Sequence, residues 1–172
     1  RDPSAYPDPT SSPYRLPWKG GDTRLCVQGN RGIVSHRDRG EYSYDFSMPV
    51  GTEVVAARGG RVIEVVVSHQ KRGPDAPNNR IGIDHGDGTS GWYLHLERGG
   101  AIVERGEVVR RGESIGRSGN VGRSLVPHLH FHVTGRTGKT IPVSFFDASV
   151  RADRGIPRIF RSYQSQNGRL GD

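Results

Sequence analysis

The stretch Pro127-His128-Leu129-His130-Phe131-His132-Val133 alternates between imidazole and apolar side chains. Because successive side chains of a β-strand point to opposite faces of a sheet, this alternation predicts a strand with three histidines on one face. The apolar side chains on the other face explain why such a strand packs against a core. They do not explain why the first face carries imidazole rather than Thr or Lys, so a solvated polar face and a metal site are both open interpretations.

Clustered imidazoles point to a metal ion, because neutral histidine is the commonest protein ligand for zinc. A hydrolytic zinc site needs about three protein ligands, typically histidine together with a carboxylate, and one open position for water. Residues 35–46 supply a second cluster, in which His36 is the obvious ligand. Asp38, Glu41 and Asp45 are all possible carboxylates, and local geometry favours none of them.

The remainder of the chain favours strands over helices. Val and Ile together number 26, against 15 for Leu, Ala and Met, and β-branched side chains fit pleated sheets better than helices. Strands are predicted at residues 50–57 and 61–67 around a glycine turn, at 80–85 and 91–96 around a turn at 86–89, at 128–133, and at 141–146. The predicted fold class is therefore mainly β, an antiparallel sheet or β-sandwich with few or no long helices.

The length of 172 residues suits one ordinary domain. Five of the eleven prolines lie in residues 1–20, which we interpret as an N-terminal Pro-rich arm draped over the domain through Tyr14 and Trp18. Residues 21–147 are expected to form the main domain, and residues 148–172 a C-terminal extension that packs on it or trails from it.

The composition also limits the class of protein. The formal net charge is +7, but 22 of the 25 cations are Arg scattered along the chain, without a basic block or a basic strand interleaved with aromatics. Nucleic acid is therefore not the expected partner, and the charge suits solubility and weak attraction to an acidic matrix. No apolar run approaches the roughly 18–20 residues that a bilayer span needs. The single cysteine, Cys26, cannot form an internal disulfide bond.

Five pieces of the sequence occur in an order that carries a resemblance. They are His36…Asp45-Phe46, Pro49 to Ala57, Tyr93-Leu94-His95-Leu96, Gly116 to Gly122, and Pro127 to Phe131. Together they resemble the lysostaphin-like (LytM-type) zinc metallopeptidases, which cleave peptide bonds in bacterial peptidoglycan, and the likeness covers roughly residues 35–133. It implies that residues 21–147 are a metallopeptidase-like catalytic domain with a substrate groove and one zinc ion. It also implies a periplasmic or secreted location, although no charged-then-apolar leader opens the sequence.

The resemblance implies a role for five residues. His36, Asp45 and His130 would bind the zinc ion, whereas His95 and His128 would be catalytic histidines that are not ligands. Asp45 is preferred among the carboxylates because it directly precedes the matching Phe46 and the Pro49-Val50-Gly51-Thr52 stretch.

Two departures from the family pattern accompany these assignments. Eight residues separate His36 from Asp45 where the family commonly has three, so a loop must return Asp45 to the metal. Position 132 holds His where the family often has Glu. His132, on the same strand face as His130, is either a partner of a metal ligand or a residue of the groove rim, and we favour the rim.

The implied function is that of a zinc-dependent endopeptidase acting, as a monomer, on the peptide part of peptidoglycan. A catalytically silent wall-binding or regulatory module of the same fold, such as an activator of a wall amidase, is the first alternative. A basic nucleic-acid-binding protein is the second. All five family positions are filled, which favours the enzyme. A glycine bridge and a direct cross-link both stay open as the bond that is cut, with a mild preference for the direct cross-link.

Overall fold

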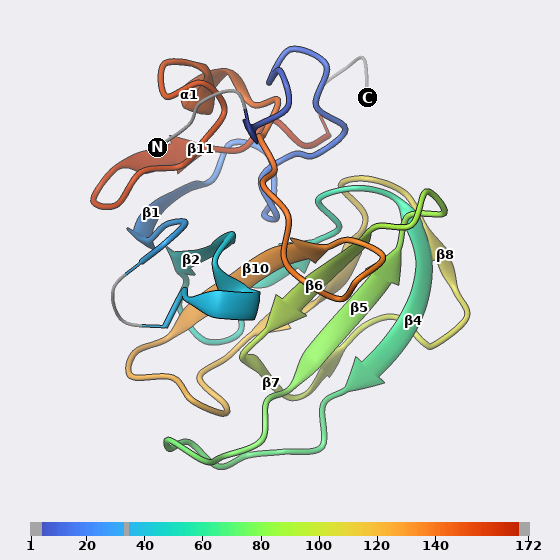
Figure 1. Cartoon of the computed structure of the whole chain (residues 1–172). Coiled ribbons are helices and arrows are strands. Elements are labelled where there is room, and N and C mark those ends of the chain that lie inside the picture. Colours follow the sequence, from blue (N-terminus) through green and yellow to red (C-terminus); the bar gives the residue numbers. More distant parts are fainter. Residues whose placement is uncertain (1–4, 33–34, 169–172) are drawn as a thin grey trace.

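A computed structural model describes residues 5–32 and 35–168, and almost all of their regular structure is β (Figure 1). The helical elements η2 (Asp38–Gly40) and α1 (Ala148–Arg151) are both short turns. Neither turn is long or apolar enough to cross a membrane. The prediction of a mainly β domain without long helices is confirmed.

The larger sheet is antiparallel and has eight strands. Their spatial order is β11 (Ser162–Gln164), β1 (Thr23–Gln28), β2 (Ser43–Ser47), β10 (His128–Thr134), β6 (Ser90–Leu94), β5 (Arg80–Asp84), β4 (Gly60–Val66) and β8 (Val108–Val109). The predicted histidine strand, β10, therefore lies in the middle of the sheet between β2 and β6.

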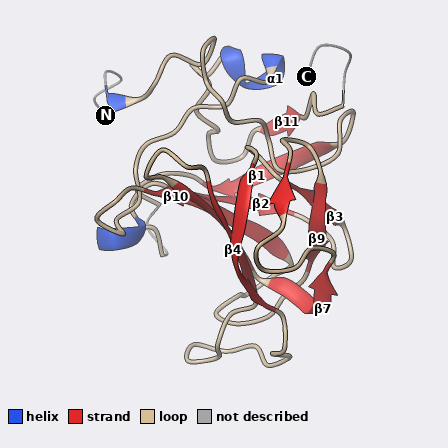
Figure 2. Ribbon diagram, turned by 90° about the vertical axis from the view of Figure 1, so that its right-hand side faces the viewer, coloured by secondary structure: helices blue, strands red, loops and turns tan. Residues whose placement is uncertain are grey.

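A second sheet of three strands lies alongside the first (Figure 2). Its order is β3 (Glu53–Val55), β9 (Ser114–Ser118) and β7 (Leu96–Ala101). A Cβ atom on Gly116 of β9 would lie 3.2 Å from the side chain of Ile81 in β5, so the two sheets approach each other closely. The core fills the space between these layers and continues beneath β2 and β10.

The apolar face of β10 belongs to this core, as its alternation predicts. Leu129, Phe131 and Val133 are fully buried, and the Phe131 ring packs 5.2 Å from the ring of Tyr93 on β6. Burying one such side chain contributes about 1.5–3 kcal/mol. Because these residues fix the inward face of β10, the alternating histidines must lie on its opposite face.

The predicted hairpin around residues 86–89 is confirmed, since β5 and β6 pair with Asp84 opposite Ser90. The strands predicted on either side of the Gly59-Gly60 turn exist, but they belong to different sheets and do not form a hairpin. A Cβ atom on Gly60 would lie 2.1 Å from the carbonyl oxygen of Asp84. Glycine is therefore needed there for close approach of β4 to β5, not for a hairpin turn.

The strand predicted at residues 141–146 is wrong. Pro142 has no N–H to give to a sheet. The N–H groups of Phe145 and Phe146 donate instead to the carbonyls of Gly155 and Tyr14. The apolar composition predicted a strand here. The segment instead belongs to no sheet, and these two N–H groups bond to the two terminal regions of the chain.

The two terminal regions pack on the sheet and on each other. The side chains of Tyr14, Leu16 and Trp18 are buried in the core, and β11 extends the large sheet beyond β1. The carboxylate of Asp147 accepts hydrogen bonds from the N–H of Leu16 (2.8 Å) and the N–H of Gln166 (2.7 Å). The division of the chain near residues 20 and 147 stays a prediction.

Candidate active site

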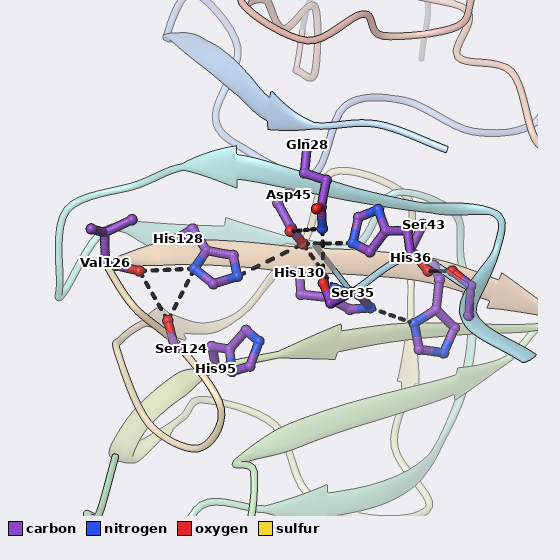
Figure 3. Close-up of polar contacts among 12 residues, drawn as sticks. Gln28, Ser35, His36, Ser43, Asp45, His95, Ser124, Val126, His128 and His130 are labelled. Carbon is purple, nitrogen blue, oxygen red and sulfur yellow. Dashed lines mark hydrogen bonds and ion pairs between the residues drawn. The ribbon is translucent and has the colours of Figure 1, made fainter. Parts of the chain in front are cut away.

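The antiparallel pairing of β2 and β10 sets two of the candidate ligands directly opposite each other. Asp45 is the cross-strand partner of His130, and its Oδ1 lies 2.8 Å from His130 Nδ1. His36, from the loop after β1, places Nε2 3.2 Å from the same oxygen. The ligand atoms of these three residues all lie within 4.8 Å of one another, as a metal site requires (Figure 3).

His36 is held in an orientation that suits a metal ligand. Its side chain is only 1% exposed, and Nδ1 donates to the carbonyl of Gly29 at 2.8 Å. Nδ1 is thus occupied by the backbone, and Nε2 is the ring nitrogen that faces Asp45. Nε2 is buried and makes no hydrogen bond of its own. An orphaned buried nitrogen aimed at a carboxylate and a second imidazole fits a zinc ion.

Asp45 is a buried carboxylate whose two oxygens face different groups. Oδ1 faces the histidines, and Oδ2 accepts a hydrogen bond from Gln28 Nε2 at 2.9 Å. Burial by itself would raise the pKa of Asp45, but the imidazoles of His130 and His36 outweigh it and hold the pKa below its ordinary value. The residue is thus an anion at neutral pH, as a metal ligand must be.

The second nitrogen of His130 also has a partner. His130 Nε2 lies 3.0 Å from Nδ1 of His132, which is two residues further along the same face of β10. Burial, followed by the charges of His130 and His36, lowers the pKa of His132 to about 3, so its ring is neutral and can accept the Nε2 proton. The interpretation of His132 as a rim residue is therefore wrong: it contacts and orients His130.

His95 and His128 lie beside this triad and are fixed by one loop, residues 121–126. His95 Nδ1 donates to the carbonyl of Val121 (2.8 Å). His128 Nδ1 lies 2.8 Å from the carbonyl of Val126 and 3.0 Å from Ser124 Oγ. The two rings are 4.6 Å apart between centroids, and His128 Nε2 lies 3.7 Å from Asp45 Oδ1. Both imidazoles therefore turn Nε2 away from the loop that holds Nδ1.

His95 occupies an unusual backbone conformation at the point where the chain leaves β6 and enters β7. Its φ angle is +66°, a left-handed conformation that costs about 1–3 kcal/mol for a residue other than glycine. Burial, together with the charges of His128 and His130, lowers the pKa of His95 to about 3. His95 is accordingly a neutral imidazole at pH 7.

The structure distinguishes between the three carboxylates that the sequence left open. Asp38 lies exposed on η2, and Glu41 forms an ion pair with Arg31. Among the described residues, only Asp45 joins His36 and His130 in a group able to hold a metal ion. The five residues named from the resemblance are brought together, and their roles stay predictions.

A cleft of about 520 Å³ opens over the triad. Its lining includes Asp45, His95, His128 and His130, as well as residues from the loops 72–74 and 123–126. A volume of this size accommodates a short peptide segment. The cleft therefore connects the candidate metal ligands with solvent along one side of the large sheet.

Sequence reasoning missed Gln28 and Ser124, and of the two roles considered for His132 it favoured the wrong one. Gln28 carried a usable signal, because it lies two residues after Cys26 and so shares the inward face of β1. A glutamine on a buried strand face needs polar partners, and Gln28 Nε2 finds them in Asp45 and in Ser35 Oγ (2.8 Å). Ser124 lies in a glycine-rich loop and offered no comparable signal.

Comparison with known protein families and sequences identifies relatives of this chain. Residues 39–142, more than half of the chain, match the model of Peptidase family M23. Lysostaphin from Staphylococcus staphylolyticus is 40% identical over 91 residues, which cover 52% of this chain and 18% of that protein. The matched region thus spans less than a fifth of that relative's length.

Solved structures share the same fold. The catalytic domain of lysostaphin from Staphylococcus simulans superposes with a TM-score of 0.53 and 28% identity, covering 70% of this chain and 87% of that one. A zinc containing peptidase from Vibrio cholerae superposes with a TM-score of 0.54 and 28% identity, covering 74% of this chain and 39% of that one. The resemblance seen in the sequence and the expected fold are confirmed.

Proposed function

Because the chain belongs to peptidase family M23, we propose that it is a zinc-dependent endopeptidase that hydrolyses peptide bonds in the stem peptides or cross-links of bacterial peptidoglycan. The observation that carries the proposal is the convergence of His36, Asp45 and His130 beneath a cleft that two further imidazoles overhang. Such a substrate implies action outside the cytoplasm, in the periplasm or after secretion. His36 precedes the residues matched by the family model, so its assignment as a ligand rests on its position here.

His36 Nε2, Asp45 Oδ1 and His130 Nδ1 are the atoms that would hold the ion. When bound, zinc supplies a Lewis acid that polarises the scissile carbonyl and acidifies a water molecule. The outer contacts of these ligands also contribute, because Gly29, Gln28 and His132 each fix the ring or carboxylate that would touch the metal.

His95 and His128 are the proposed acid and base. Each has Nδ1 anchored on a backbone carbonyl, so each Nε2 is free to accept a proton from the attacking water and to return it to the leaving amine. Proton transfer by a positioned imidazole contributes about 10²–10⁴-fold to a rate. No Ser or Cys nucleophile is needed, and the thiol of Cys26 is buried.

The catalytically silent module receives no support from the site. A degenerate member would lack a ligand or a catalytic imidazole, and all five positions are filled here. The test is digestion of purified peptidoglycan of defined cross-link type by the zinc-loaded protein, with the products identified by mass. New amino termini that disappear after chelation and return with zinc support the proposal. Stoichiometric zinc binding without cleavage of any peptidoglycan would instead identify a binding or regulatory module.

A further inference from the structure

One wall of the cleft is built by two loops that are about fifty residues apart in the sequence. The N–H of Gly73 donates to the carbonyl of Gly122 (3.0 Å), and the N–H of Gly122 donates to the carbonyl of Lys71 (2.9 Å). Arg72 and Gly122 form a parallel bridge. This pairing brings Arg72 next to the segment that carries Arg123, and both arginines line the cleft.

The two arginines give this wall a positive charge that nothing in the cleft neutralises. Among the described residues that line the cleft, Asp45 is the only carboxylate, and it is engaged with the histidines and Gln28. Arg72 donates to neutral groups, namely the carbonyl of Leu125 (3.4 Å) and the side-chain oxygen of Asn120 (3.0 Å). Arg123 is exposed and makes no hydrogen bond or ion pair within residues 5–32 and 35–168.

Other arginines of this protein do have acidic partners. Arg58 pairs with Asp87 at 2.8 Å, and Arg161 pairs with Asp153 at 2.8 Å. Within the described residues, the guanidinium of Arg123 has no such partner. Pro74, Leu125 and Val126 line the cleft beside the two arginines and carry no charge.

The position of Arg123 relates it to the reacting groups. It lies in loop 121–126, whose carbonyls at Val121 and Val126 hold His95 and His128. A ligand bound by Arg123 would therefore lie beside the two imidazoles proposed as acid and base. Guanidinium groups bind carboxylates through paired, charge-assisted hydrogen bonds, which impose orientation as well as affinity.

We propose that Arg72 and Arg123 form a subsite for a carboxylate of the substrate next to the scissile bond. The preferred substrates are then peptides with a free carboxyl group at that position, rather than their carboxamide forms or neutral oligoglycine bridges. This inference rests on the proposed function, because it places the carboxylate relative to the bond that is cut.

The test uses two synthetic cross-linked stem peptides that differ only in one carboxyl group beside the cross-link, free in one and a carboxamide in the other. Binding is measured by fluorescence anisotropy with zinc-loaded His128→Ala protein, and cleavage is measured with the zinc-loaded wild type. The free acid should be favoured about tenfold in Kd and in kcat/KM, since a hydrogen bond to a charged group corresponds to roughly this factor. An oligoglycine peptide should behave like the carboxamide.

Variants then assign the preference to the arginines. In both assays Arg123→Gln should reduce the preference for the free acid over the carboxamide to about threefold or less. The Arg72→Gln/Arg123→Gln double variant should bring this ratio close to one. Arg123→Lys should retain part of the preference because it keeps the charge without the planar fork. Arg105→Gln is the matched control, because Arg105 is an exposed arginine that does not line the cleft, and it should keep the full ratio.

The outcomes separate this inference from the proposed function. Equal binding and cleavage of the two peptides by proteins with intact arginines would overturn the carboxylate subsite and leave the endopeptidase standing. A ratio that persists in the double variant would overturn it as well. A binding ratio that depends on the arginines, without cleavage of any peptide by the wild type, would support the subsite and refute the proposed enzyme.

Discussion

Asp45 and His130 are direct cross-strand neighbours on β2 and β10, and Asp45 Oδ1 lies 2.8 Å from His130 Nδ1. The register of two strands therefore fixes two of the three candidate ligands, and only His36 comes from a loop. Side chains directly opposite each other in an antiparallel pair have Cβ atoms about 4.5–5.5 Å apart. A metal site built this way is rigid in its carboxylate and in one imidazole before any ion arrives.

This arrangement separates the roles of the two histidines on β10. His130→Ala should lose stoichiometric zinc and all peptide hydrolysis, because it removes one of three ligands. His128→Ala should keep one zinc per chain and lose about 10²–10⁴-fold in kcat. Metal content by elemental analysis, with kcat on the same preparations, measures both effects. Hydrolysis by zinc-free His130→Ala protein would contradict the assignment.

Gln28 should matter for metal affinity, although it does not touch the site of the ion. Its Nε2 donates to Asp45 Oδ2 at 2.9 Å and so holds Oδ1 toward the histidines. Gln28→Ala should weaken zinc binding by about 10–100-fold, the usual effect of removing an outer partner of a ligand. Gln28→Glu should be worse, because it sets a second carboxylate against Asp45.

Competition with a chelating dye measures the zinc affinity of these Gln28 variants. Gln70→Ala is the control, since Gln70 is an exposed glutamine that accepts a hydrogen bond from Arg98 on the surface. Wild-type affinity in Gln28→Ala would show that the strands alone position Asp45.

His132 is expected to act through His130. His132→Ala leaves His130 Nε2 without its partner at 3.0 Å, and zinc affinity should fall by about tenfold or more. His132→Gln places a side-chain oxygen that can accept the same proton, so it should recover most of the loss. Zinc affinity, measured as for Gln28, is the readout. A merely space-filling residue would be replaced equally well by leucine, so equal zinc affinities of His132→Leu and His132→Gln would contradict this prediction.

The sequence predicts the parts of this architecture that depend on local alternation. β10 followed from the alternation of imidazole and apolar side chains, and the β5–β6 hairpin followed from the turn at residues 86–89. The strand expected at 141–146 failed because Pro142 and long-range hydrogen bonds to Gly155 and Tyr14 decide its backbone. Local apolar composition cannot reveal those partners.

In the candidate site, too, local features were predictable from the sequence and long-range contacts were not. The chemistry of His130 is visible in one strand, but the choice of Asp45 over Asp38 and Glu41 needed the family resemblance, because it depends on which carboxylate the fold returns to the histidines. The cleft wall was not predictable, since Arg72 and Arg123 line the same wall only through the pairing of two distant loops. The positioning contacts of Gln28 and His132 depend on strand register in the same way.

The buried carboxylate of Asp147 connects the N-terminal region of the chain with the C-terminal region. It accepts hydrogen bonds from the N–H groups of Leu16 and Gln166. Asp147→Asn leaves one of these buried N–H groups facing an amide NH₂, so the free energy of unfolding at neutral pH should fall by about 1–3 kcal/mol. Urea denaturation measures the change. Asp75→Asn, at an exposed site, should leave the free energy of unfolding within about 0.5 kcal/mol of the wild type.

The difference in free energy of unfolding between the wild type and Asp147→Asn should depend on pH with a defined sign. Burial is the largest influence on the pKa of Asp147 and raises it above its ordinary value of 3.8, against the lowering effect of the hydrogen bonds from Leu16 and Gln166. The folded chain therefore holds this proton at pH values where the unfolded chain has lost it, and the contribution of Asp147 to stability declines as the pH rises through that window. Asp147→Asn removes this decline. The stability of the wild type relative to the variant should thus fall as the pH rises from just below 3.8 through the folded pKa and then level off; a difference that grows with pH would mean that the hydrogen bonds outweigh burial.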